Sequence, residues 1–168
     1  MKTLILALVA NIFFGINFCY AKPIKVLLLD GQNNHNWKAT TPVLIEALEA
    51  ENLCKITVST SPPKKSPKEA WSEWKPNFKE FDAVLTNYNG EMWPENIQKA
   101  LVDYVKSGGA FIVVHAANNA FSGWAEYNEM IGLGGWGGSS EKSGPYLYFD
   151  DKGKLIRDPR PGRGGSHG

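Results

Sequence analysis

Four short apolar runs alternate with amphipathic segments along the chain, and polar loops follow three of the runs. The runs cover residues 24–30, 54–60, 81–87 and 110–114. The last, AFIVV, contains no polar position. Such a run is typical of a parallel strand that is covered on both faces by helices. The pattern therefore predicts four strands, with residues 110–114 as a buried, central strand.

Two helices are predicted between these runs. One should run from Thr40-Thr41-Pro42 to about residue 52, because a hydroxyl residue followed by proline is a common helix start. The other should cover residues 95–106, after Pro94 and before the glycine pair at 108–109. Strand, helix and strand at this spacing form a βαβ unit with parallel strands. The fold class is therefore expected to be α/β with a mostly parallel sheet.

The chain after residue 121 is less regular. A short helix is predicted at residues 124–131 and a β-hairpin at 146–156, with its turn at residues 151–153. The glycine-rich stretch at 132–138 lacks the spacing of a phosphate-binding loop. No further strand or helix is predicted after the hairpin. We therefore expect one domain, residues 22–168, that is incomplete at its C-terminus.

Residues 1–21 have the pattern of a secretory signal peptide. Lys2 precedes an apolar stretch at residues 4–18, and Ala21 is a suitable cleavage position. The stretch is short for a membrane span, although a membrane anchor is the alternative. Cleavage would leave a secreted or periplasmic protein with no membrane span. It would remove one of 18 basic residues and leave 17 basic and 17 acidic ones, a neutral balance that argues against a nucleic-acid partner.

Polar loops at residues 30–37, 87–93 and 115–124 follow the first, third and fourth predicted strands. Parallel strands bring such loops to one edge of the sheet, where α/β domains bind ligands. Amide and imidazole groups pair with hydroxyls, and indole rings stack on sugar faces, so a small-molecule carbohydrate is the expected partner. Turn preference alone would also explain the asparagines near residue 35. The substrate-binding candidates are His35, Asn36, Trp37, Asn89, Asn118, Asn119, Trp124 and His167.

His115 and Glu91 are the candidate catalytic acid and base, because each lies in a strand-end loop with polar neighbours. A histidine directly after a buried strand can instead be a structural core residue, so this alternative stays open for His115. The chain has three histidines, His35, His115 and His167. Three imidazoles could bind zinc and leave a position for water, but none of the usual short ligand spacings is present. Zinc is therefore a candidate cofactor only.

Several segments together resemble the ThuA-like (trehalose utilisation) family. The resemblance lies in residues 26–31 with 35–37, residues 81–85, residues 108–117 with 120, 121 and 124, and residues 134–135 with 165–168. It implies a flavodoxin-like three-layer sandwich, as in class I glutamine amidotransferases. Where those enzymes hold a catalytic cysteine, this chain has His115-Ala116-Ala117, so amidotransferase chemistry is not expected. The resemblance also implies His35, His115 and His167 as site residues.

The family resemblance implies a role in the metabolism of trehalose, related disaccharides or keto-sugars. The first hypothesis is an exported hydrolase or other sugar-converting enzyme that acts on a sugar or glycoside at this crevice. The alternative is a non-catalytic carbohydrate-binding module that uses the same residues. A structural or interaction protein is less favoured. The sequence does not indicate an oligomeric state.

Overall fold

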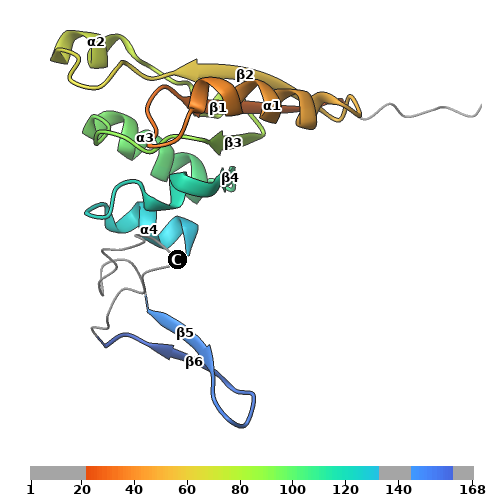
Figure 1. Cartoon of the computed structure of the whole chain (residues 1–168), viewed down its shortest axis with the longest axis vertical. Coiled ribbons are helices and arrows are strands. Elements are labelled where there is room, and N and C mark those ends of the chain that lie inside the picture. Colours follow the sequence, from red (N-terminus) through yellow and green to blue (C-terminus); the bar gives the residue numbers. More distant parts are fainter. Residues whose placement is uncertain (1–21, 133–144, 161–168) are drawn as a thin grey trace, which may run out of the picture.

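The computed structural model describes residues 22–132 and 145–160 (Figure 1). Strands and helices alternate through the first part, and a separate hairpin follows. The elements in chain order are β1 (Ile24–Asp30), α1 (Trp37–Glu49), β2 (Cys54–Thr60), α2 (Lys68–Glu73), η1 (Phe78–Glu80), β3 (Ala83–Thr86), α3 (Glu95–Lys106), β4 (Ala110–Val113), η2 (His115–Asn119), α4 (Ala125–Ile131), β5 (Tyr146–Phe149) and β6 (Leu155–Asp158). The last two strands pair antiparallel, as the hairpin pattern predicted.

The first four strands form one parallel sheet in the order β2-β1-β3-β4. The chain moves outward from β1 to β2 and then returns to the other side of β1, so β1 and β3 are neighbours. This is the strand order of the flavodoxin-like fold, in which the ligand crevice lies where the order reverses. The crevice is therefore expected beyond the carboxyl ends of β1 and β3.

Helices cover both faces of the sheet. On one face, Val26 and Leu28 pack against Leu44 and Leu48 of α1. On the other, Leu27 and Leu29 belong to a larger cluster that includes residues of α3 and α4. Because alternate residues of one strand serve the two clusters, every position of β1 from Val26 to Leu29 is apolar and buried. The final residue, Asp30, is buried but charged. The predicted three-layer α/β fold is confirmed.

Within the described ranges, the helices are all too short or too polar to cross a bilayer.

The loops after β3 and β4 pack onto the larger core cluster through aromatic side chains. Trp93, in the loop after β3, lies 5.0 Å from Phe121 between ring centroids. Phe121 in turn lies 5.0 Å from Tyr127 of α4. Contacts of this kind stabilise by more than their buried area alone. The loops after β3 and β4 are therefore held against the core by their aromatic side chains.

Strand β4 differs from the prediction, because it lies at an edge of the sheet and is not covered on both faces. Its residues alternate between exposed and half-buried, and Ile112 is 46% exposed. An apolar run indicates which residues are suited to burial, but their actual burial also requires a neighbouring element. The side chain of Ile112 is therefore only partly covered.

Helix α1 begins at Trp37, earlier than the predicted start at Thr40-Thr41-Pro42. Asn36 is the N-cap, and its side-chain oxygen accepts a hydrogen bond from the Ala39 amide at 3.3 Å. Asparagine is as good an N-cap as threonine. The earlier cap adds a turn to the helix and shortens the loop after β1.

Candidate functional site

The loops after β1 and β3 are joined where the strand order reverses. Asn33 donates a side-chain hydrogen bond of 2.8 Å to the backbone oxygen of Asn87. Asn89 donates from its side chain to Asn34 at 3.0 Å and from its backbone to Gln32 at 2.9 Å. Amide side chains both donate and accept hydrogen bonds, so they can pair with backbone groups and with one another. Together the two loops form one polar surface at the carboxyl edge.

A buried carboxylate fixes the base of this surface. Asp30, at the end of β1, is only 2% exposed. Its two oxygens accept hydrogen bonds from Thr41 of α1 at 2.8 Å and Thr60 of β2 at 2.7 Å. A buried carboxylate needs such partners because an unpaired one is costly. The direction of the loop that starts at Gly31 is therefore set by contacts to two other elements.

His35 and His115 are brought together at this edge from positions 80 residues apart. Their Nε2 atoms lie 3.2 Å from each other, and their ring centroids are 4.8 Å apart. His35 comes from the loop after β1, and His115 is the first residue of η2, separated from β4 by Val114 alone. Both side chains are exposed to solvent. The histidine pair is therefore open to a ligand in the crevice, which argues against the core-histidine alternative.

The backbone of His115 is in the left-handed region, with φ of 46°. This conformation is uncommon for a residue other than glycine and occurs preferentially at functional sites. It turns the chain sharply after β4 and into η2. Without that turn, the His115 side chain would not be directed toward His35.

Two imidazoles at hydrogen-bonding distance can share one proton between their Nε2 atoms. One ring must then donate and the other accept, and a ligand that displaces this contact meets one proton donor and one acceptor. Histidine is the side chain best suited to such exchange near neutral pH. The pair can therefore act chemically as an acid and a base.

The same nitrogens could instead hold a metal ion. Two tetrahedral zinc ligands at roughly 2.0–2.1 Å would lie about 3.3 Å apart, close to the 3.2 Å observed. Within residues 22–132 and 145–160, no group of three histidine, cysteine, aspartate or glutamate side chains is arranged to bind a metal. His167 lies outside the described residues. The described residues thus provide two ligands at most.

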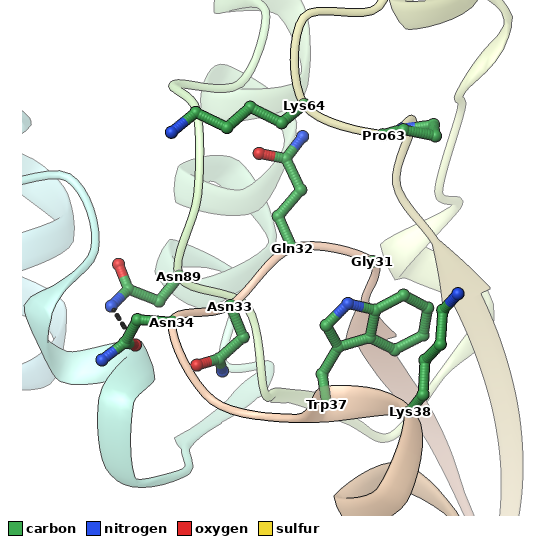
Figure 2. Close-up of a pocket in the computed structure, with 9 residues that line it drawn as sticks. All are labelled: Gly31, Gln32, Asn33, Asn34, Trp37, Lys38, Pro63, Lys64 and Asn89. Carbon is green, nitrogen blue, oxygen red and sulfur yellow. Dashed lines mark hydrogen bonds between the residues drawn. The ribbon is translucent and has the colours of Figure 1, made fainter.

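A cavity of about 440 Å³ adjoins the joined loops (Figure 2). Trp37 provides its aromatic wall, and the amides of Asn34 and Asn89 provide a polar one. This volume is within the range of small-molecule sites. The complete lining is Gly31, Gln32, Asn33, Asn34, Trp37, Lys38, Pro63, Lys64 and Asn89. Of the predicted substrate-binding residues, Trp37 and Asn89 line it directly, and His35 lies between lining residues in the sequence.

Glu91 is placed differently from His115. Its carboxylate accepts hydrogen bonds of 3.1 Å from the backbone amide of Lys65. Its own backbone amide donates to Gln32, and its backbone oxygen accepts from the Tyr88 hydroxyl at 2.7 Å. Burial, with a further contribution from the Glu91 charge, raises the pKa of that hydroxyl well above its usual range. Glu91 therefore connects loops, and no described hydrogen bond joins it to either histidine of the pair.

The other candidates lie in structural positions. Trp124 is 5% exposed and packs in the aromatic core, so its ring faces are covered. Asn36 caps α1. Asn118 and Asn119 lie half-buried in η2, and the side-chain oxygen of Asn119 is buried without a hydrogen-bond partner among the described residues.

The lining residues that sequence reasoning missed include Gln32, Lys38 and Lys64. Gln32 and Lys38 flank the predicted cluster, so their proximity could have been noticed. Lys64 belongs to the proline-rich connector after β2, and nothing in that segment indicates that it returns to the crevice. Its position depends on the path of the connector, which local pattern does not encode.

Residues 25–156 match the family described as ThuA, trehalose utilisation. The chain is also similar to the crystal structure of a candidate ThuA-like protein from Parabacteroides merdae ATCC 43184, with 44% sequence identity and a TM-score of 0.78. The similarity covers 88% of this chain and 51% of that one, so the chain spans about half the length of that relative. No curated protein matches the chain. Since the family match extends over most of the sequence, the chain belongs to the ThuA family of trehalose utilisation.

Proposed function

We propose that this protein is an exported member of carbohydrate metabolism that converts a sugar or glycoside at the carboxyl edge of its sheet. The observation that carries the proposal is the 3.2 Å contact between the Nε2 atoms of His35 and His115. Both rings are exposed, and His35 belongs to the segment whose residues Asn34 and Trp37 line a cavity with an indole wall and amide groups, which is chemistry suited to a sugar. Family membership supports a saccharide as the ligand.

In this proposal the histidine pair carries out the proton transfer that the reaction requires. A protonated imidazole donates to the leaving oxygen of a glycoside, or a neutral one takes the proton of a sugar hydroxyl. General acid–base catalysis of this kind contributes roughly 10²–10⁴-fold to a rate. Trp37 and Asn89 hold the sugar beside the pair. Glu91 supports the loops rather than acting on substrate.

The test combines turnover and binding in one variant. His115→Asn is suited to it because asparagine tolerates the left-handed backbone that the position requires. We expect turnover of trehalose or of a keto-disaccharide to fall at least about 100-fold while binding measured by calorimetry is kept. The limb of the wild-type pH–rate profile that reports the catalytic acid or base should be lost in the residual activity of the variant. Circular dichroism and thermal melting check that the variant is folded.

The two candidate functions give different results in the same experiment. A wild-type protein that binds these sugars without converting them is a carbohydrate-binding module, and the enzyme proposal fails. A His115→Asn variant with wild-type turnover would show that the pair is not the catalytic group. Loss of both binding and turnover in a folded variant would make His115 a binding residue.

Export is the second component of the proposal, and it rests on the pattern of residues 1–21. Cleavage after Ala21 would make Lys22 the first residue of the mature protein. Intact mass measurement of the protein from the secreted or periplasmic fraction tests this directly. A full-length mass with Met1 retained would contradict cleavage.

A further inference from the structure

The cavity lined by Trp37 and Asn89 has charged residues of one sign only. Lys38 and Lys64 line the cavity, and none of its lining residues is acidic. Figure 2 shows Lys64 extending past the amide of Gln32, with Lys38 beside the indole of Trp37 on the other side of the cavity. Neither lysine takes part in a salt bridge within the described part of the chain. The two ammonium groups therefore have no ion-pair partner among the described residues.

Helix α1 adds to this charge. Trp37 and Lys38 are its first two residues, and its first turn contains no acidic residue. The amide groups at a helix N-terminus carry a partial positive charge that favours anions nearby. The start of α1 and the side chains of Lys38 and Lys64 thus all border the same cavity.

The amide side chains of the lining are already largely paired with the protein. Gln32 donates to the backbone of Pro62 and accepts from the Glu91 amide. Asn33 donates to Asn87 and accepts from the His35 amide. Asn34 and Asn89 share one side-chain hydrogen bond and keep further polar atoms for a ligand. The ammonium groups of the two lysines add capacity that is donor only. A ligand that satisfies them must present acceptors, and a charged acceptor does so most strongly.

We infer that the preferred ligand is a saccharide carrying an anionic group, a carboxylate or a phosphate, rather than a neutral sugar. This inference rests on the proposed function, since it names the substrate class of the same crevice. The anionic group lies between Lys38 and Lys64, and the sugar ring lies against Trp37. The reacting bond then lies toward the histidine pair.

Calorimetry with three matched sugars tests the inference on the full chain. Glucose, glucuronate and glucose 6-phosphate share one ring, and only the last two carry an anion. We expect at least one of these two to bind about tenfold more tightly than glucose at low salt, and the preference to shrink at 0.5 M salt. The difference between them identifies which anion fits.

Two variants test whether the preference for anionic sugars arises in the cavity. Lys38→Ala/Lys64→Ala together should abolish the preference, so that the ratio of the affinity for the anionic sugars to that for glucose falls to about one. Lys152→Ala serves as the control, because Lys152 is an exposed residue in the hairpin turn. The anionic preference should be unaffected by that change.

Equal affinity for all three sugars would overturn the inference while leaving the proposed function intact. A preference that survives the double lysine variant would also overturn it. If none of the three sugars binds, both the inference and the proposed sugar site fail. The anionic inference and the proposed catalytic pair are separable, because the lysine variants leave His35 and His115 in place.

Discussion

The hydroxyl of Tyr127 donates a hydrogen bond of 2.7 Å to the backbone oxygen of Ala117. Tyr127 belongs to α4, and Ala117 lies two residues after His115 in η2. Both residues are fully buried. This contact ties the short helix that carries His115 to the aromatic core beneath it.

Tyr127→Phe should lower the free energy of unfolding by about 1 kcal/mol, because it removes one buried hydrogen bond and keeps the ring packing. The Ala117 oxygen also accepts a bond from the Ala120 amide, which limits the loss. Urea unfolding measures the change. Tyr148→Phe is the matched control, since that ring is 46% exposed, and its effect should stay within about 0.5 kcal/mol. Equal losses in the two variants would contradict the assigned role.

Alkaline pH should destabilise the protein through its buried tyrosines. Burial raises the pKa of Tyr88 and of Tyr127 well above the ordinary value of 10.0. In each case the folded pKa exceeds the unfolded one, so the stabilisation is fully present below pH 10 and is lost as pH rises beyond it. The free energy of unfolding should fall above pH 10 by up to about 1.4 kcal/mol per pH unit for each tyrosine.

The Tyr88→Phe/Tyr127→Phe double variant isolates this effect. Although less stable at neutral pH, it should lose less stability than the wild type between pH 10 and pH 11. Guanidinium unfolding at pH 9, 10 and 11 gives both slopes. Parallel slopes would assign the alkaline loss to groups other than these two phenols.

The strands and the second helix could be predicted from the sequence because their signals are local. Residues 24–30 and 54–60 are β-branched or aliphatic runs with clear borders, and the structure has β1 and β2 at those positions. Helix α3 at residues 95–106 has proline before it and a glycine pair shortly after it. Such signals do not depend on distant partners.

The start of α1 was not predictable, because distant partners decide it. The hydroxyls of Thr40 and Thr41 were expected to cap the helix. Instead, Thr41 donates to Asp30, and Thr40 accepts from Asn87, which lies 47 residues further on. With these hydroxyls engaged elsewhere, Asn36 caps the helix. Propensity identified suitable residues but could not choose among them.

The location of the candidate site at the carboxyl edge of the sheet could be predicted from the sequence, but the full set of residues that form it could not. Parallel strands bring their loop ends to one edge, and the meeting of His35 with His115 follows from that rule. The rule does not say which way a side chain turns. Trp124 turns into the core and Glu91 turns to the Lys65 amide, although both lie in strand-end loops.

Gly31→Ala tests how closely β1 and β2 approach below the cavity. A Cβ atom at Gly31 would lie 2.4 Å from the Ser61 hydroxyl oxygen and 2.7 Å from the Ser61 backbone nitrogen and oxygen. The backbone φ of 116° adds strain for any other residue. We expect a loss of more than about 2 kcal/mol in the free energy of unfolding.

Gly153→Ala is the control for Gly31→Ala. Gly153 also has a positive φ, 73°, but no atom lies within 4 Å of its added Cβ. It should therefore show the backbone cost alone, about 1 kcal/mol. Chemical unfolding of both variants separates the steric part as their difference. Equal costs would mean that Ser61 moves aside freely.

Zinc should bind to the histidine pair and inhibit turnover. The 3.2 Å separation of the two Nε2 atoms fits two ligands of one tetrahedral ion. A coordinated Nε2 has no lone pair or proton to exchange, so zinc binding and acid–base use exclude each other. Competition with a chromophoric chelator should show at least about tenfold weaker zinc binding in His35→Asn and in His115→Asn, and a chelator should restore wild-type turnover. His167→Asn shows whether the third imidazole contributes. Identical zinc affinity in the wild type and in both pair variants would place the ion elsewhere, and stimulation by zinc would make the pair a metal site rather than a proton-transfer pair.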